Sequence, residues 1–216
     1  MRPERFRRLV KVLSRRQPDL TVLMDMVNKP YNFSAILRSC DAVGVLEAHV
    51  VPPEHGLELH HATSAGTRKW IRVTSYGDVT SAEAHLRGAG FRIVAAHPSH
   101  EARDFRALDF TRPTAFLLGA ELRGISAAGL DAADDHVLIP MEGMVHSLNV
   151  SVAAALLLYE ARRQREAAGM YERCRLDPET FCRTLFAWTH PFLAAKLDAE
   201  GRPYPPLDDD GEIVKE

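Results

Sequence analysis

Apolar runs alternate with helical patterns through the middle of the chain. Runs with the length and composition of buried strands cover residues 20–27, 46–51, 70–73, 91–96, 115–119 and 137–140. Between these runs, residues 34–44, 79–88 and 125–133 have the pattern of helices. Gly44 is placed to end the first of these helices. Strands that alternate with helices predict an α/β fold with a parallel sheet covered on both faces. We place this core at residues 18–165.

Amphipathic segments flank the core on both sides. Residues 3–17 carry apolar positions at helical spacing opposite a basic face, which predicts a basic helical extension over residues 1–17. The segment beyond Gly169 is expected to be helical as far as Pro191 and then Pro-rich and acidic. We define it as a C-terminal extension over residues 166–216, so the pattern predicts one α/β domain with two extensions.

The composition is that of an ordinary globular protein, with 46% hydrophobic and 26% charged residues among 216. A formal net charge of -2 would argue against a nucleic-acid partner, but the charge is unevenly distributed. Glu4 is the one acidic residue in a strongly basic segment between Met1 and Gln17. A second basic group follows the last apolar helix, at Arg162, Arg163, Arg165, Arg173 and Arg175.

Several classes of protein are disfavoured. No apolar run approaches the roughly 20 residues of a membrane span, and no apolar segment follows the basic N-terminus as in a secretory signal. The cysteines are few and widely spaced, which fits a reducing compartment, so we expect a soluble cytoplasmic protein. The histidines at 60–61 and 97–100 lack Cys or carboxylate partners at ligand spacing, so no metal site is predicted.

Ligands of open α/β sheets bind at the loops that leave the carboxyl ends of the strands, and three such loops carry unusual residues. The first loop leads into the helix at 34–44, where Asn32 or Ser34 can act as N-cap. Arg38 lies on this helix among apolar neighbours. It can extend to solvent or pair with Asp41, or its planar guanidinium can be aimed at a phosphate.

The second loop follows the strand at 115–119 and contains Gly119, Glu121 and Gly124. The two glycines can be simple turn residues, or they can allow the backbone to approach a ligand closely. The spacing differs from the GxGxxG fingerprint of dinucleotide-binding folds, and no GxSxG nucleophile elbow is present. A nicotinamide-dependent enzyme and a serine hydrolase are therefore disfavoured.

The third loop, residues 139–153, crowds three polar side chains at the entrance of an apolar helix. Ser147 or Asn149 is sufficient as the N-cap, and Ser151 can bond back to the preceding turn. At least one polar group is then left over, and a buried polar group without a partner is costly. Helix capping therefore leaves at least one of the three polar groups unexplained.

Together and in this order, the three loops resemble the motifs of the SpoU (TrmH) branch of the SPOUT RNA methyltransferases. Asn32 and Arg38 match the first motif, the segment from Gly119 to Gly124 matches the second, and Ile139–Ala153 matches the third. Other segments, including "RRQPDLTVLMDMV", "SCDAVGV" and "YEARRQREAAGMY", resemble the bacterial tRNA guanosine 2′-O-methyltransferases of this branch. The resemblance therefore covers nearly the whole chain.

The resemblance implies a fold and partners that the periodicity does not predict. It implies a deep C-terminal trefoil knot, and a homodimer with the apolar helix after Asn149 at the interface and the active site shared between subunits. It implies S-adenosylmethionine as cofactor, held between the second and third loops. The implied cofactor-binding residues are Ala96, His97, Leu118, Gly119, Gly124, Ile139, Met141 and Leu148.

The implied reaction is transfer of a methyl group to a ribose 2′-hydroxyl of tRNA without a metal. The basic helix before residue 18 and the long C-terminal extension favour guanosine 18 of the D-loop. Arg38 is either the general base or the group that orients a substrate phosphate as proton acceptor. The other implied catalytic residues are Asn32, Glu121, Ser147 and Asn149, with Ser147 and Asn149 facing the cofactor and the ribose while another group caps the helix. Expected RNA contacts are Arg7, Arg8, Arg16, Arg163, Arg165 and Arg173.

Two alternatives stay open, namely the same chemistry on another RNA, such as rRNA or the tRNA anticodon loop, and a non-catalytic RNA-binding relative. The chain also departs from close relatives at three positions. Those relatives often have histidine where this chain has Asn28 and Tyr31, and glutamine where it has His146. Tyr31 directly precedes Asn32, so its departure bears on contacts with the substrate.

Overall fold

The computed structural model describes residues 2–53, 66 and 69–214. The pair His60 and His61 lies outside these residues. The chain divides into two compact units, Pro18–Gly169 and a second unit made of Met1–Gln17 with Met170–Glu216. Within the described part of the chain, no helix has the length and apolar character needed to cross a membrane.

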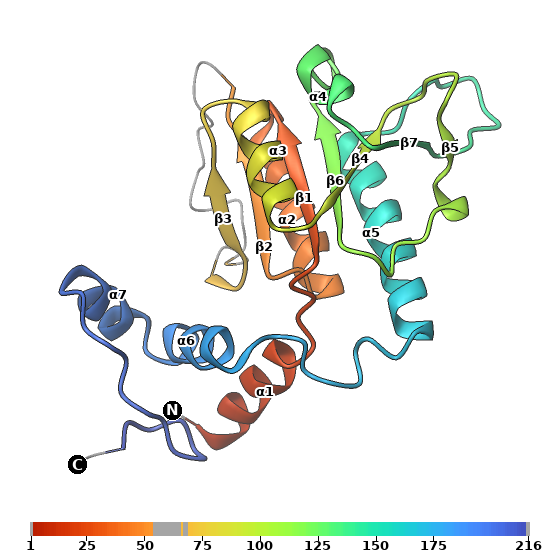
Figure 1. The fold of residues 1–216 in the computed structure, drawn as a ribbon. Helices are drawn as coiled ribbons and strands as arrows, with labels where there is room; N and C mark the ends of the chain where they lie inside the picture. The colour runs from red at the N-terminus through yellow and green to blue at the C-terminus, as the bar shows by residue number, and fades with distance from the viewer. Residues whose placement is uncertain (1, 54–65, 67–68, 215–216) are drawn as a thin grey trace. The chain divides into compact units, whose positions relative to one another are not determined.

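The Pro18–Gly169 unit contains one sheet of seven strands in the order β3-β2-β1-β6-β4-β7-β5, all parallel (Figure 1). The strands are β1 Leu20–Asp25, β2 Glu47–Val51, β3 Arg72–Ser75, β4 Arg92–Ala96, β5 Arg103–Asp104, β6 Thr114–Gly119 and β7 Asp135–Leu138. The predicted parallel α/β sheet is confirmed. Strand β5 was not predicted because two residues are too short to show a period.

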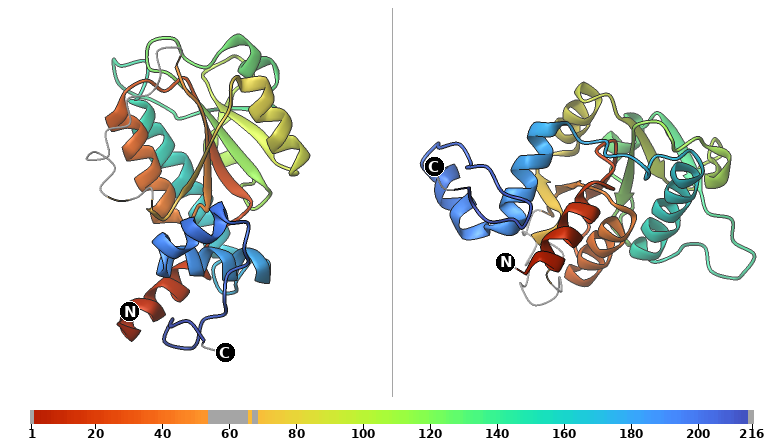
Figure 2. Two further views of the ribbon diagram at one scale, coloured as in Figure 1. Left: turned by 90° about the vertical axis from the view of Figure 1, so that its left-hand side faces the viewer. Right: turned by 90° about the horizontal axis from the view of Figure 1, so that it is seen from below.

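Helices cover both faces of the sheet (Figures 1 and 2). Helices α2 (Pro30–Val43) and α5 (Val150–Ala167) pack side by side on one face, and α3 (Val79–Gly88) and α4 (Ala127–Asp131) lie on the other. The side chains of β1 alternate between the two layers. Val22 and Met24 belong to the apolar cluster that contains α2 and α5, whereas Leu23 belongs to the cluster under α3.

Helix α2 begins four residues earlier than the sequence pattern predicts. Pro30 occupies its first turn, where proline costs no hydrogen bond and its fixed φ suits a helix. Asn32 and Ser34 are consequently helical residues and not N-caps, so the predicted capping role is wrong for both. The predicted C-terminus is confirmed, because Gly44 ends the helix in the left-handed conformation at φ 86.

The second unit contains α1 (Pro3–Leu13), α6 (Pro178–Thr189) and α7 (Pro191–Ala199). The expected end of helical structure at Pro191 is wrong, because Pro191 instead opens α7, again at a first helical position. Phe186, Ala194 and Leu197 form the small core of this unit. The two segments that the sequence presents as separate extensions thus fold into one unit.

Candidate functional site

Three side chains from separate loops meet at the carboxyl ends of the neighbouring strands β1 and β6. Asn32, in the first turn of α2, donates from Nδ2 to Oε1 of Glu121, which follows β6. Asn149, before α5, donates from Nδ2 to the same Glu121 oxygen over 3.2 Å and to Oδ1 of Asn32 over 3.2 Å. The structure therefore brings together three of the five predicted catalytic residues.

Asn149 serves both the helix and this network. Its Oδ1 accepts hydrogen bonds from the backbone N–H of Ser151 over 2.8 Å and from the Ser151 hydroxyl over 2.6 Å, so it is the N-cap of α5. Its Nδ2 at the same time bonds Glu121 and Asn32. The expectation that another residue caps the helix is wrong, since one amide does both tasks.

Lys29 completes the network and was not found from the sequence. Its Nζ lies 2.8 Å from Oε2 of Glu121. The pKa of Lys29 is raised chiefly by its hydrogen bond to Glu121 and secondly by one to Tyr31. Glu121 thus receives donors on both carboxylate oxygens. A lone lysine in a loop has no pattern that would single it out, because its partner is far away in the sequence.

The second loop is a tight turn that presents Glu121. Ala120 and Gly124 exchange two backbone hydrogen bonds of 3.0 and 2.7 Å. A Cβ atom on Gly119 would lie 2.2 Å from the backbone of Gly124, so only glycine fits there. Gly124 itself has φ +69. These two glycines are required by the turn, and this accounts for them without a ligand.

Arg38 lies apart from the network within one chain. It is exposed, and it forms no hydrogen bond or ion pair with any residue in the described ranges, including Asp41. It is six residues beyond Asn32 on α2, which places it about 9 Å further along the helix axis. The guanidinium is therefore free to meet a group that this chain alone does not supply.

A pocket of about 130 Å³ lies at the ends of β4 and β7. Five predicted cofactor-binding residues line it, namely Ala96, His97, Ile139, Met141 and Leu148. The predicted catalytic residue Ser147 lines it as well. Leu118, Gly119 and Gly124 are not among its lining residues, because Leu118 is buried in β6 and the glycines form the neighbouring turn.

The chemistry of this pocket fits part of S-adenosylmethionine. Its aliphatic side chains and the Met141 thioether suit a flat apolar ring, while Ser147 offers a polar group in the lining. Pockets that hold drug-sized ligands typically have volumes of roughly 300–1,000 Å³. This pocket is smaller, so it can enclose only part of S-adenosylmethionine.

The predicted RNA-binding arginines divide into two groups. Arg7, Arg8, Arg163 and Arg173 are exposed. Arg165 is wholly buried, and its guanidinium bonds the Asp19 carboxylate over 2.6 Å and three backbone carbonyls. Arg16 is also buried and lies over the Trp188 ring. The prediction that Arg16 and Arg165 contact RNA is therefore wrong for this structure, because neither side chain reaches the surface.

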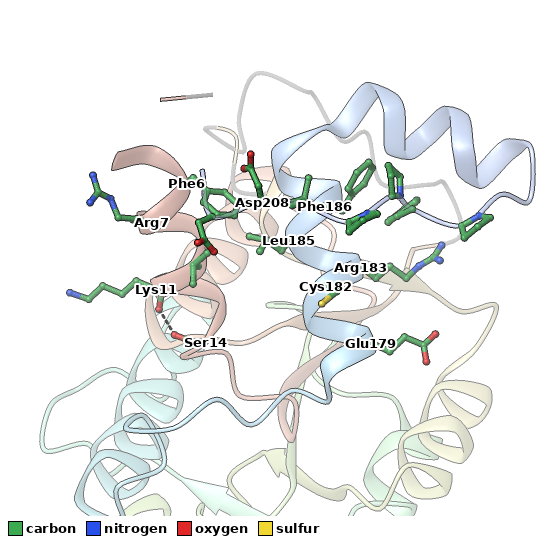
Figure 3. Close-up of a pocket in the computed structure, with 17 residues that line it drawn as sticks. Phe6, Arg7, Lys11, Ser14, Glu179, Cys182, Arg183, Leu185, Phe186 and Asp208 are labelled. Atoms are coloured by element: carbon green, nitrogen blue, oxygen red, sulfur yellow. Dashed lines mark hydrogen bonds between the residues drawn. The ribbon is translucent and has the colours of Figure 1, made fainter. Parts of the chain in front are cut away.

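A larger cavity of about 1040 Å³ lies in the second unit (Figure 3). Its wall combines Phe6, Leu185 and Phe186 with prolines of the segment 203–209. Three basic and three acidic residues line it, so the formal charges of its lining sum to zero. None of the predicted catalytic or cofactor-binding residues lines it.

The histidines and cysteines within the described residues are not arranged as a metal centre. His97 lines the small pocket, and His100 is exposed beside Glu101. Across residues 2–53, 66 and 69–214, no group of three or more His, Cys, Asp or Glu side chains is arranged to hold a metal ion. Of the cysteines, Cys40 is buried, whereas Cys174 and Cys182 are exposed, and all are free thiols.

Two buried carboxyl groups, one on β1 and one on α3, were not predicted from the sequence. Asp25, the last residue of β1, accepts a 2.8 Å hydrogen bond from the backbone N–H of Ser126 and so holds the start of α4. Glu83 is 3% exposed, and its Oε1 has no hydrogen-bond partner within the described part of the chain. Burial raises the pKa of Glu83 to about 7, with Arg87 opposing and Asp25 and Asp134 adding to the shift.

This raised pKa predicts a pH dependence of stability. Because the folded pKa of Glu83 exceeds the unfolded value of about 4.5, its contribution is fully present below that value and is lost as the pH rises toward 7. Glu83→Gln should remove this loss and stabilise the protein above pH 7 by roughly 2–3 kcal/mol. Urea unfolding between pH 4.5 and 8 measures it. Exposed Glu101→Gln is the control, and equal pH profiles of wild type and Glu83→Gln would contradict the prediction.

The chain is similar to RNA methyltransferases along nearly all of its length. The SpoU rRNA Methylase family matches residues 19–159, and the family described as SpoU, rRNA methylase, C-terminal matches residues 163–216. The tRNA (guanosine(18)-2′-O)-methyltransferase of Escherichia coli strain K12 is 48% identical over 215 residues, which are 99% of this chain and 94% of that protein.

Two crystal structures extend the similarity to the fold. The TrmH/SpoU tRNA modifying enzyme of A. aeolicus matches with a TM-score of 0.81 and 40% identity, covering 89% of this chain and 96% of that one. The SpoU methyltransferase AviRb of Streptomyces viridochromogenes, in complex with the cofactor AdoMet, matches with a TM-score of 0.61 and 33% identity. That match covers 70% of this chain and 60% of the other.

Proposed function

The chain belongs to the SpoU methylase family, and on this premise we propose that it methylates the ribose 2′-hydroxyl of guanosine 18 in tRNA, with S-adenosylmethionine as methyl donor. The observation that carries the proposal is the network of Asn32, Glu121 and Asn149, in which the three motif loops meet. The extensions favour tRNA over rRNA, because the similarity to the tRNA enzyme of Escherichia coli includes both of them.

The residues of the network position the site and do not perform the proton transfer. Both oxygens of Glu121 are already bound by donors, so this carboxylate is suited to holding the three loops in register. When bound, S-adenosylmethionine supplies a methyl group made electrophilic by its positive sulfur. Arg38, which is exposed and without a partner in the described chain, is the group that meets the ribose or an adjacent phosphate.

The cofactor is assigned to the pocket between β4 and β7. Ala96, Ile139, Met141 and Leu148 would hold its adenine, and Ser147 and His97 would contact its polar part. We retain the C-terminal trefoil knot as part of the proposal. Membership of the SpoU methylase family supports it. A cytoplasmic location also stays a prediction.

A homodimer is proposed from an apolar face of α5. Val152, Leu156 and Tyr159 follow one another at helical spacing on this helix and are exposed by 46%, 40% and 50%. Leu156→Glu places a charge at the centre of this stripe and should weaken dimerisation at least about tenfold, the effect of roughly 1.4 kcal/mol. Light scattering on a dilution series measures it. Arg162, a polar residue further along the same helix with a 39% exposed side chain, gives the control Arg162→Glu. If neither Leu156→Glu nor Arg162→Glu alters the mass measured by light scattering, the assignment of this face of α5 to the dimer interface is contradicted.

RNA binding is assigned to the exposed basic residues Arg7, Arg8, Arg163 and Arg173. Changing all four to glutamine should weaken tRNA binding and reduce the slope of log affinity against log salt by about one for each phosphate that the protein no longer neutralises. Filter binding at several salt concentrations measures both quantities. Arg87→Gln and Arg103→Gln, which remove partly exposed arginines outside the assigned set, should change neither. An affinity that does not depend on salt would contradict this assignment.

The proposed function is tested by methyl transfer to defined RNAs. Unmodified tRNA and rRNA are incubated with the protein and methyl-labelled S-adenosylmethionine, and the labelled nucleotide is mapped. We expect the label at guanosine 18, and its loss when that nucleotide is replaced by 2′-deoxyguanosine. Label in rRNA or in the anticodon loop would reassign the substrate, and no label in any RNA would favour a non-catalytic RNA-binding protein.

A further inference from the structure

An exposed aromatic ring stands directly beside the network. Tyr31 is 57% exposed and precedes Asn32 in the first turn of α2. Among the Phe, Tyr and Trp side chains described in the Pro18–Gly169 unit, only Tyr31 and Tyr159 are exposed. Tyr159 lies ten residues beyond Asn149 on α5, about 15 Å along the helix axis, so Tyr31 is the aromatic side chain at the network.

The position of this ring is tied to Glu121. The ammonium of Lys29 lies over the Tyr31 ring, 5.8 Å from its centroid, and the same ammonium lies 2.8 Å from Oε2 of Glu121. A cation held by a carboxylate thus supports the ring from one side, while more than half of the side chain faces solvent. An exposed tyrosine usually has no such support, so the ring is partly preorganised for a ligand.

The proposed substrate has a group that needs a surface of this kind. A base is attached to the ribose carbon next to the one that bears the 2′-hydroxyl, so a hydroxyl at the network places its base close by. A nucleotide that leaves its stacked position to enter a site loses a few kcal/mol of stacking. Proteins commonly offset this cost by stacking the extruded base on an aromatic side chain.

We propose that Tyr31 is the stacking platform for the unstacked purine base of the target nucleotide. The inference rests on the proposed function and extends it to the recognition of the substrate. Stacking tolerates different bases, since each has a flat face, so Tyr31 contributes to engagement of the nucleotide and not to the choice of guanine. Tyr31 is therefore a substrate-binding residue, and it takes no part in proton transfer.

A double-mutant cycle between the ring and the base tests this assignment. The enzymes are wild type, Tyr31→Ala, Tyr31→Leu and Tyr31→Phe. The substrates are tRNA with guanosine at the target position and tRNA with an abasic ribose there, which keeps the 2′-hydroxyl. On guanosine tRNA, Tyr31→Ala should lower kcat/KM by about 5-fold to 150-fold, the range that loss of one base–aromatic stack gives. On abasic tRNA, wild type and Tyr31→Ala should agree to within about twofold.

The conservative variants separate stacking from other roles of the side chain. Tyr31→Phe keeps the flat face and should retain activity on guanosine tRNA, whereas Tyr31→Leu keeps apolar volume without a flat face and should resemble Tyr31→Ala. Affinity for S-adenosylmethionine, measured by calorimetry, should be equal in all four enzymes. An equal loss on both substrates, or no loss in Tyr31→Ala, would overturn the inference. Failure of wild type to label guanosine 18 would instead overturn the proposed function.

Discussion

Arg165→Met is expected to destabilise the protein by about 3–5 kcal/mol, the usual cost of removing one partner of a buried ion pair. Arg165 is 0% exposed, and its Nη1 lies 2.6 Å from Oδ1 of Asp19. Its Nε donates to the carbonyl of Phe110, and its Nη2 donates to the carbonyls of Asp19 and Arg112. Methionine fills much of the volume but satisfies none of these acceptors, so a carboxylate and several carbonyls would lose their donor.

Arg162→Met is the matched control, because it is the same change three residues earlier on the same helix. The Arg162 side chain is 39% exposed and pairs at i,i+4 with Glu166, whose side chain is 58% exposed. Exposed pairs of this kind contribute about 0–1 kcal/mol. Urea unfolding of the full-length protein compares the two variants, and the stability of Arg162→Met should hold. Equal stability of the two variants would contradict the structural role of Arg165.

The order of strands and helices could be predicted because each element carries its period within a few adjacent residues. Parallel strands with both faces covered are buried along nearly their whole length and are mostly apolar, as in β1 and β6, and such runs are hard to mistake. Two helix boundaries were predicted wrongly, and each of them lies at a proline. Pro30 and Pro191 begin helices, although proline also commonly follows the end of one, and the two cases look alike without the neighbouring structure.

The site was only partly predictable, for a different physical reason. The resemblance singled out Asn32, Glu121 and Asn149, and the structure then joined them by hydrogen bonds across long sequence separations. Lys29 and Asp25 had no local pattern, because their partners are on other loops. The same limitation concealed the burial of Arg165. The run "ARRQR" reads as a solvated basic surface, because the partners of the buried Arg165, among them Asp19, 146 positions earlier, are far away in the sequence.

Arg38→Ala is expected to lower the methylation rate by at least about 100-fold, the lower range for the loss of an acid–base group, and to leave the fold intact. The methylation rate should fall without a loss of stability because of the position of the Arg38 side chain. Its side chain is exposed and makes no hydrogen bond or ion pair with the described residues, so its removal breaks no such interaction within the chain. Exposed substitutions of this kind usually change stability by no more than about 0.5 kcal/mol. Single-turnover methylation and urea unfolding measure the two quantities.

Arg38→Lys distinguishes the two roles that remain for this side chain. A lysine keeps the positive charge but lacks the planar fork that binds a phosphate through two parallel hydrogen bonds. If Arg38 orients a substrate phosphate as the proton acceptor, part of the rate should return in Arg38→Lys, with weaker binding of tRNA. If the guanidinium itself takes the proton, the lysine variant should have its own pH profile, because an ammonium group loses its proton at lower pH than a guanidinium does. Turnover near the wild-type rate in Arg38→Ala would remove this residue from the mechanism and leave the reaction to the groups around Glu121.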